Sequence, residues 1–443
     1  MELFEKIYDI IGDDSFNAFI TLRPKEEVLK EAKELLERGI EPKPITVKDN
    51  IATKGIRTTA GSKILQAYVP VFDATTVRKL KEKGYVIIGK TNMDEFGMGT
   101  TGENSAYGPA KNPLDTSKVT GGSSSGAGAA ARGYCLPGIG SDTGGSIRAP
   151  AAWCSVFSLK PTYGAVSRYG LIPYADSLEQ ISPIAPSVSQ LVEIFEIISG
   201  KDPRDHTTVK KPDLKEFDVE KLRFVVPENA LELVDPEVRN AFNSFIRKLK
   251  NVEYKKVKAL EKALPAYYVI ALAEASSNLA RYDGIRYGLP EELLPEVTEN
   301  FYDFIAEVRG KYFGWEVKRR IAMGATVLSA GYSEELYLRA LKARKAVYEE
   351  LNEIVRESVL IMPTMPVTPP SFGAKSSPKE LFAMDVLTVP VNLAGLPAGN
   401  APIADGIGIQ VVAERWGEGK IVSFLRFAEE YYRVSCQKLE ART

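Results

Sequence analysis

A long central stretch that is poor in charge constrains this chain more than any other feature. Between about residues 94 and 184 it is rich in Gly, Ser, Ala, Thr and Pro, yet apolar residues recur throughout, as in YCLPGIG and AAWCSVFSLKP. A flexible linker of this length would be polar. We therefore expect a buried, tightly turned region, in which small residues let backbones or a ligand approach closely.

The segments on either side of this stretch alternate between helical and extended patterns. Before it, apolar residues recur at helical spacing in 25–39 and 73–84, and PITVKDNIA and YVIIGKT are typical of strands. After it, the patterns predict strands at LRFVVPEN, VEYKKVKAL, VLIMP and GIGIQVVAE, and helices over 235–250, most of 266–356, and 420–438. This alternation indicates an α/β fold: one large domain over 1–443, with a helical insertion at about 230–356.

Charge and hydropathy argue against two classes of partner. The 443 residues contain 57 Lys and Arg and 58 Asp and Glu, so the net charge of −1 does not suit a chain that holds nucleic acid by its overall charge. No run of about eighteen apolar residues exists, and the acidic start MELFEKIYDIIGDD is not typical of a signal or transit peptide, so we expect no membrane contact. Cys135, Cys154 and Cys436 lie far apart in sequence, which predicts reduced thiols and a cytoplasmic location.

A single histidine limits the chemistry that the chain can perform. His206 lies in the polar, turn-rich segment KDPRDHTT, so a His-rich metal site is excluded and a His-based nucleophilic mechanism would depend on that one residue. We expect no metal site. The chemistry must come mostly from Ser, Lys, Asp, Glu, Arg or Tyr side chains.

Two glycine-rich loops in the central stretch are the strongest candidates for a site. They are GGSSSG at 121–126 and GSDTGGSIRAP at 140–150. Such loops are often merely flexible, and some bind phosphate, but the P-loop spacing and its lysine are absent here. The second loop follows an apolar strand and precedes a helix, so its backbone N–H groups can converge as an oxyanion hole beside Ser146, a candidate nucleophile.

Lys48 is the candidate base for that serine. It lies in the strand-like segment ITVKDNI, where a lone lysine could equally belong to a solvated face. A lysine base must be neutral, and lowering its pKa of about 10.4 by about three units means destabilising the cation by roughly 4 kcal/mol. Burial against the small, uncharged residues of the central stretch would supply that effect.

Together, G-G-S-S-S-G, G-S-D-T-G-G-S-I-R-x-P and the upstream V-K-D-N resemble the amidase signature family. The resemblance implies a central mixed β-sheet flanked by helices on both faces, and a catalytic core at about 40–190. It also implies a nucleophile, Ser146, a relay serine after a cis peptide, Ser123, and the base Lys48, with no cofactor. The N–H groups of Thr143, Gly144, Gly145 and Ser146 would hold the oxyanion. The spacing between the loops is one residue shorter than the family pattern, which keeps Ser124 open as the relay.

Longer segments resemble one branch of that family, the A subunits of the tRNA-dependent amidotransferases. Among them are TNMDEFGMGTTGENSAYGPAKNP, EASSNLARYDGIRYG and DVLTVPVNLAGLP. The resemblance implies that the chain hydrolyses glutamine or asparagine and passes ammonia to a B subunit, which uses ATP and Mg²⁺ and binds Glu-tRNA(Gln) or Asp-tRNA(Asn), with a small C subunit in the same complex. The alternatives are a stand-alone amidase acting on an aliphatic or aryl amide, and a scaffold without catalysis.

The same resemblance implies the residues that bind a free amino acid. Arg320 would pair with its α-carboxylate through a planar guanidinium, and Asp385 with its α-ammonium. Tyr267 and Met98 would line the pocket. Each has a simpler explanation as a surface helix residue, a cap or a core side chain. SLEQISP in place of SLDQIGP and the unusual PAGNAPIADGIGIQVVAERWGEGK leave the amide donor and the coupling to the B subunit open.

Overall fold

One twisted sheet organises the computed structural model, which describes residues 1–287, 289, 292, 294, 300–374 and 377–434. Within these residues, eleven strands follow one another across the sheet in the order β1-β3-β2-β4-β6-β5-β10-β11-β9-β7-β8. The strands are β1 (Phe19–Leu22), β2 (Lys43–Lys48), β3 (Tyr85–Thr91), β4 (Gly138–Asp142), β5 (Phe157–Lys160), β6 (Gln180–Ala185), β7 (Phe224–Pro227), β8 (Val252–Lys255), β9 (Val359–Pro363), β10 (Ala398–Ala404) and β11 (Ile407–Val412).

The sheet is mixed. β2 is parallel to both β3 and β4, and β7 is parallel to β8 and β9, whereas β6, β5, β10 and β11 pair in antiparallel fashion across the middle. Because β2 and β4 are parallel, their carboxyl ends lie at the same edge of the sheet. β6 runs antiparallel to β4 and begins at that edge, where Gln180 pairs with Asp142.

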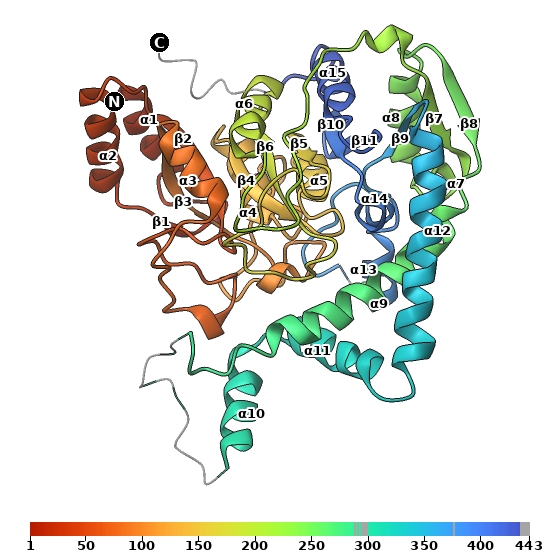
Figure 1. The fold of residues 1–443 in the computed structure, drawn as a ribbon. Helices are drawn as coiled ribbons and strands as arrows, with labels where there is room; N and C mark the ends of the chain where they lie inside the picture. Colours follow the sequence, from red (N-terminus) through yellow and green to blue (C-terminus); the bar gives the residue numbers. More distant parts are fainter. Residues whose placement is uncertain (288, 290–291, 293, 295–299, 375–376, 435–443) are drawn as a thin grey trace.

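Helices lie along the sheet and extend beyond it (Figure 1). They are α1 (Glu2–Ile11), α2 (Lys25–Glu37), α3 (Thr75–Glu82), α4 (Ser125–Gly133), α5 (Arg148–Trp153), α6 (Val188–Ile198), α7 (Glu228–Glu232), α8 (Pro236–Ile246), α9 (Ala259–Leu279), α10 (Phe301–Tyr312), α11 (Trp315–Leu328), α12 (Leu338–Val355), α13 (Pro378–Ala383), α14 (Val389–Ala394) and α15 (Glu418–Glu429). The helices α9, α10 and α11 extend away from the sheet, at the bottom of Figure 1.

Alternating strand residues build a core on each face of the sheet, as the pleat requires. On one face, side chains such as Val47 and Ile87 pack with α3, α6, α8 and α15. On the other face, Val86 and Ile88 pack against α1, α2 and α4 at one end of the sheet. At the other end, strand residues such as Leu360 contact α9, α12 and α14. The expected α/β fold, a mixed sheet with helices on both faces, is therefore confirmed.

The local predictions agree with the structure where hydrophobic periodicity is strong. The strands expected at PITVKDNIA, YVIIGKT, VLIMP and GIGIQVVAE are present as β2, β3, β9 and β11. Most of the central stretch is buried, except for much of 103–118 and for 168–173. The closing helix expected over 420–438 ends at Glu429. β1 and β10 were not predicted, since each is short or interrupted by Gly, Asn and Pro.

The expectation of three reduced thiols is wrong for Cys135. Cys154 is a free and fully buried thiol, whereas Cys135 is disulfide-bonded, and Cys436 lies outside the described residues. Separation along the sequence, on which that expectation rested, does not measure distance in the fold. In the part of the chain that the structure describes, no helix has the length and apolarity needed to cross a membrane.

Candidate active site

Lys48 lies at the edge of the sheet where β2 and β4 end. It is the last residue of β2, and its side chain is fully buried. Its Nζ donates to Ser123 Oγ at 2.8 Å and to Ser141 Oγ at 3.0 Å, the latter from the adjacent strand β4. The sheet thus fixes the lysine at a point where it meets a hydroxyl of the first glycine-rich loop.

Burial lowers the pKa of Lys48 to about 7, against the opposing effect of nearby carboxylates. Desolvation penalises the ammonium form, while Glu179, Asp94 and Asp142 favour it. A lysine with this pKa is neutral for a large fraction of the time near pH 7. It can therefore accept a proton, as a general base must.

The first glycine-rich loop presents Ser123 to Lys48. The Gly122–Ser123 peptide bond is cis, as the resemblance implied. A Cβ added to Gly122 would lie 1.9 Å from Asp94 Oδ2, so only glycine lets this carboxylate pack under the loop. Ser124 is turned the other way, and its Oγ donates to the carbonyl of Ser141 at 3.2 Å. Of the two candidate relay serines, Ser123 is therefore the one that contacts the lysine.

The second glycine-rich loop carries Ser146 beside a set of backbone donors. Ser146 is largely buried, with 8% of its surface exposed, and its carbonyl accepts from the N–H of Ser124 at 3.0 Å, which joins the two loops. The N–H of Gly145 donates to Asp142 Oδ1 at 3.0 Å. Among the described residues, nothing accepts from the N–H groups of Thr143, Gly144 and Ser146. These three are the donors left for an oxyanion.

Asp142 holds the second loop in shape. Its carboxylate accepts from the N–H groups of Gly145 and Ile147 and from Arg148, whose Nε and Nη2 lie 3.0 and 2.9 Å from its two oxygens. Burial alone would raise the pKa of Asp142, but the charge and hydrogen bonds of Arg148 outweigh it and hold this pKa well below its usual range. Asp142 and Arg148 are fully buried, so they form an ionised pair beneath the loop.

Residues far along the chain form further hydrogen bonds with the Asp142–Arg148 pair. Arg148 donates to the carbonyl of Thr388 at 3.1 Å and to the side chain of Gln410 on β11. Asn392 of α14 donates to Asp142 Oδ1 at 2.9 Å. Residues more than 200 positions downstream therefore satisfy the buried charges that support the loop.

Arg320 lies on the inner side of α11, with 4% of its surface exposed. Its Nη1 donates to the hydroxyl of Tyr174 at 2.7 Å and its Nε to Glu316 Oε1 at 2.7 Å. The guanidinium carbon also lies 5.8 Å from the ring centroid of Tyr268. Burial would lower the pKa of Arg320, but Tyr174 and Glu316 outweigh it, so the guanidinium remains charged. The structure therefore excludes an exposed surface position for Arg320.

Asp385 follows α13 and faces the same region. Its Oδ2 accepts from Tyr268 of α9 at 2.6 Å and from Thr100 at 3.0 Å. The side chain is partly buried, and this burial raises the pKa of Asp385 to about 6, against the hydrogen bonds that favour the carboxylate and the charge of Arg320. Opposite charges from α11 and from the segment after α13 thus meet around Tyr268, as a zwitterionic ligand requires.

Tyr267 and Met98 occupy different positions. The hydroxyl of Tyr267 would lie 2.3 Å from a Cβ added to Gly144, so this tyrosine packs directly against the oxyanion loop. Met98 is fully buried in the core cluster that also contains Tyr174 and Tyr267. The structure brings Tyr267 to the loop and buries Met98 in the same core cluster as Tyr267.

Several residues of the site escaped the sequence analysis. Ser141 is a hydroxyl at the end of an apolar strand, and Tyr268 is the neighbour of a tyrosine that was chosen. Tyr174 was not considered, and Glu179 stands in SLEQISP, which was noted only for its difference from SLDQIGP. The GSDTGG motif did contain a signal for Asp142, since a carboxylate in an uncharged stretch needs a buried partner.

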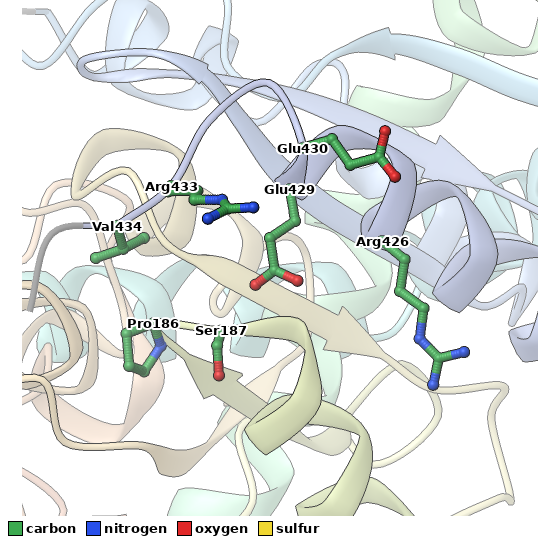
Figure 2. A pocket seen from close by; sticks show the side chains of 7 residues that line it. All are labelled: Pro186, Ser187, Arg426, Glu429, Glu430, Arg433 and Val434. Carbon is green, nitrogen blue, oxygen red and sulfur yellow. The ribbon is translucent and has the colours of Figure 1, made fainter.

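The rest of the molecule offers no competing centre of the same kind among the described residues. His206 is exposed and lies in a loop. No group of three or more His, Cys, Asp or Glu side chains there is arranged to hold a metal ion. A surface pocket between the start of α6 and the end of α15 is lined by Pro186, Ser187, Arg426, Glu429, Glu430, Arg433 and Val434 (Figure 2). Glu429 in this pocket already accepts from the N–H of Val188, so it caps α6.

Comparisons with known proteins identify the family of this chain. The family model described as Amidase matches residues 3–422. The A subunit of glutamyl-tRNA(Gln) amidotransferase from Saccharolobus solfataricus is 47% identical, over 97% of this chain and 92% of the relative. The protein of the same name from Archaeoglobus fulgidus is 46% identical, over 95% of this chain and 94% of the relative. The crystal structure of the same protein from Thermotoga maritima superposes with a TM-score of 0.79 at 37% identity, covering 97% of this chain and 91% of that one.

Proposed function

The chain belongs to the amidase family, and we propose that it is the ammonia-producing subunit of a tRNA-dependent amidotransferase, with Lys48, Ser123 and Ser146 as its catalytic residues. The similarity to amidotransferase A subunits over nearly the whole chain favours this function over a stand-alone amidase. One observation carries the assignment of residues. The fully buried Lys48, whose pKa burial lowers to about 7, donates a 2.8 Å hydrogen bond to Ser123 in the loop joined to Ser146.

The proposed reaction uses only side chains and backbone of this chain. Neutral Lys48 takes a proton from Ser123 as Ser123 takes one from Ser146, and Ser146 Oγ attacks the carboxamide carbon. The N–H groups of Thr143, Gly144 and Ser146, which have no acceptor among the described residues, bind the oxyanion. The proton returns through Ser123 to the leaving nitrogen and ammonia departs. Water then hydrolyses the acyl-enzyme.

The proposed substrate is glutamine or asparagine as the free amino acid. The positive guanidinium of Arg320 and the carboxylate of Asp385 suit an α-carboxylate and an α-ammonium. Both come from the helical side of the molecule, Arg320 from α11 and Asp385 from the turn after α13. Tyr268 contacts both groups and fixes their separation.

The proposed partners are an amidotransferase B subunit, which uses ATP and Mg²⁺ and binds Glu-tRNA(Gln) or Asp-tRNA(Asn), and a small C subunit, in the cytoplasm. The outer side of α10 and α11 supports a protein partner. Phe301 and Tyr302 at the start of α10 and Trp315 at the start of α11 are exposed, Tyr302 and Trp315 over 79% and 77% of their surfaces. Aromatic side chains are enriched at protein interfaces.

The experiment that tests this function measures ammonia released from glutamine and asparagine. The chain would be assayed alone, then with candidate B and C subunits and charged tRNA. Hydrolysis that is weak alone and rises with partners and tRNA supports the proposal. A chain that is inert on both amino acids but fast on an aryl or aliphatic amide is a stand-alone amidase, and Arg320 and Asp385 would then need another role.

A further inference from the structure

A buried carboxylate that the proposed reaction does not use lies beside Lys48. Glu179 directly precedes β6, whose first residue pairs with Asp142 at the end of β4. β4 in turn pairs with β2, which ends at Lys48. The sheet register therefore brings Glu179, Asp142 and Lys48 to the same edge, on three neighbouring strands.

Glu179 is only half satisfied by hydrogen bonds. It is 1% exposed, and its Oε2 accepts from the N–H of Tyr174 at 2.9 Å. Its Oε1 is buried and has no hydrogen-bond partner among the described residues. A buried carboxylate oxygen without a partner costs free energy unless a nearby positive charge compensates for it.

The other carboxylates that act on Lys48 are already neutralised or held. Both carboxylate oxygens of Asp142 accept hydrogen bonds from Arg148, and the N–H of Gly145 donates to one of them as well. Asp94 accepts from Asn104 on one oxygen and Gly102 on the other. The buried Lys90, on β3, donates to the carbonyl of Ile51 and to Thr58 and faces Asp49, so it does not compensate Glu179.

We propose that Glu179 is a positioning residue that balances the positive charge of Lys48 each time the lysine accepts the serine proton. When Ser146 attacks, its O–H bond breaks, a proton passes through Ser123, and a new Nζ–H bond forms on Lys48. The carboxylate of Glu179 stabilises the resulting ammonium in a site from which water is excluded. The proton then leaves with ammonia, and Lys48 is neutral again. This proposal depends on the proposed role of Lys48 as the base.

The titration of the two groups is consistent with this arrangement. Burial raises the pKa of Glu179 to about 7, with the Tyr174 N–H opposing that rise, Asp176 adding to it, and Lys48 and Arg168 lowering it. Among the charges that act against the burial of Lys48, that of Glu179 has the largest effect. A nearby carboxylate favours the ammonium form of Lys48, which suits a base that becomes charged during the reaction.

The test compares Glu179→Gln with the wild-type chain in the assembly that gives full activity. Rates of ammonia release from glutamine would be measured between about pH 5 and 9. Removing the carboxylate lowers the pKa of Lys48, so we expect the acid limb of kcat/KM to move down by about one pH unit. The ammonium is destabilised by the same amount, so kcat should fall by up to about tenfold while KM changes less than about threefold. An acid limb and kcat equal to those of the wild type would overturn the proposal.

Two variants keep this test decisive. Glu179→Asp retains the charge but moves it away from Lys48 by one methylene. The acid limb of its kcat/KM profile should therefore shift in the same direction as in Glu179→Gln, by less than half as much. If Glu179→Gln does not fold, an unchanged limb and kcat in Glu179→Asp overturn the proposal by themselves. Glu418→Gln is the matched control, because Glu418 is also a buried carboxylate with an unpartnered oxygen but acts on Lys160; its limb should stay in place.

Lys48→Ala distinguishes a failure of the proposed base from a failure of the proposed role of Glu179. Normal ammonia release by that variant would refute Lys48 as the base and the proposed function of the site. A dead Lys48→Ala variant together with a wild-type pH profile in Glu179→Gln would refute only the role of Glu179.

Discussion

The two sides of the site are built in different ways. The proposed catalytic side consists of a strand end and two glycine-rich loops, which carry the proposed reactive residues Lys48, Ser123 and Ser146. The substrate side consists of helices and a turn, from which Arg320 and Tyr268 extend long side chains. Proton transfer needs fixed distances and a dry environment, whereas recognition of a small zwitterion needs charged groups that reach into a space from a stable frame.

This difference decides how much change each side tolerates. On the catalytic side a single methyl group collides with its neighbours, as at Gly122 beside Asp94 and Gly144 beside Tyr267. On the substrate side the contacts are side-chain tips, such as the hydroxyl of Tyr174 on Arg320. Changes to the catalytic loops should therefore abolish the reaction, whereas changes to the helical side should mainly alter affinity.

The largest expected effect is that of Ser146→Ala. Removing the nucleophile should reduce ammonia release from glutamine by about 10⁴-fold or more, while the unfolding temperature stays within about 2 °C, because one small hydroxyl is lost. The measurement is a coupled ammonia assay with thermal unfolding as its control. Substantial residual glutaminase activity in a folded variant would refute Ser146 as the nucleophile.

Substitution of the adjacent residues Ser123 and Ser124 tests which of them relays the proton on the catalytic side. Ser123→Ala should lose about 10³-fold in kcat because the proton path to Lys48 is cut. Ser124→Ala removes only a hydrogen bond to the Ser141 carbonyl and should lose less than about tenfold. The two variants differ by one position and one hydroxyl, so each is a control for the other. The reverse order of effects would make Ser124 the relay.

Asp142→Asn tests whether the loop depends on its buried ion pair. The change leaves the Arg148 guanidinium buried without its counter-charge, so we expect the free energy of unfolding to fall by about 3 kcal/mol. Denaturant unfolding measures it. The matched control is Asp176→Asn, a partly exposed partner of Arg168, which should cost less than about 1 kcal/mol. Equal losses in the two variants would show that the Asp142 pair contributes no more than a surface one.

The smallest expected effect is on the substrate side. Arg320→Lys keeps the charge but loses the planar guanidinium, so KM for glutamine should rise about 10- to 100-fold while kcat falls less than about threefold. Steady-state kinetics separate the two. Arg319→Lys is the control, one position along α11: Arg319 is partly buried against Glu316, Met323 and the ring of Phe382 and does not contact Tyr174, so KM should change less than in Arg320→Lys. A fall in kcat with constant KM would contradict a role for Arg320 in substrate binding and indicate a role in the reaction itself.

The sequence was sufficient to single out the residues that the structure brings together at the two glycine-rich loops, because those residues stand in local motifs. Lys48, Ser123 and Ser146 each stand in a short pattern whose residue types have few other uses together. The neighbouring positions Tyr267 and Tyr268 show the limit on the helical side. Consecutive helical residues point about 100° apart, and only packing decides that Tyr267 meets the oxyanion loop while Tyr268 binds Asp385.

Most features of the site that the sequence did not predict depend on contacts between residues far apart in the chain. Glu179 reaches Lys48 only through the pairing of β6 with β4 and of β4 with β2, which no local pattern encodes. The bond from the Gly145 N–H to Asp142, which leaves three of the four expected oxyanion donors, is likewise a detail of loop conformation. Sheet order and loop geometry are set by the whole chain, so they became visible only in three dimensions.

The ties between Arg148 and the distal residues Thr388, Asn392 and Gln410 have a consequence for the growing polypeptide. The oxyanion loop is translated in the first half of the protein, but the partners of its supporting charges leave the ribosome only after about 250 more residues have been added. A nascent chain that already holds Lys48, Ser123 and Ser146 therefore lacks the groups that shape the loop. We therefore expect the proposed hydrolysis of glutamine to begin only after β11 has joined the sheet and Gln410 has met Arg148.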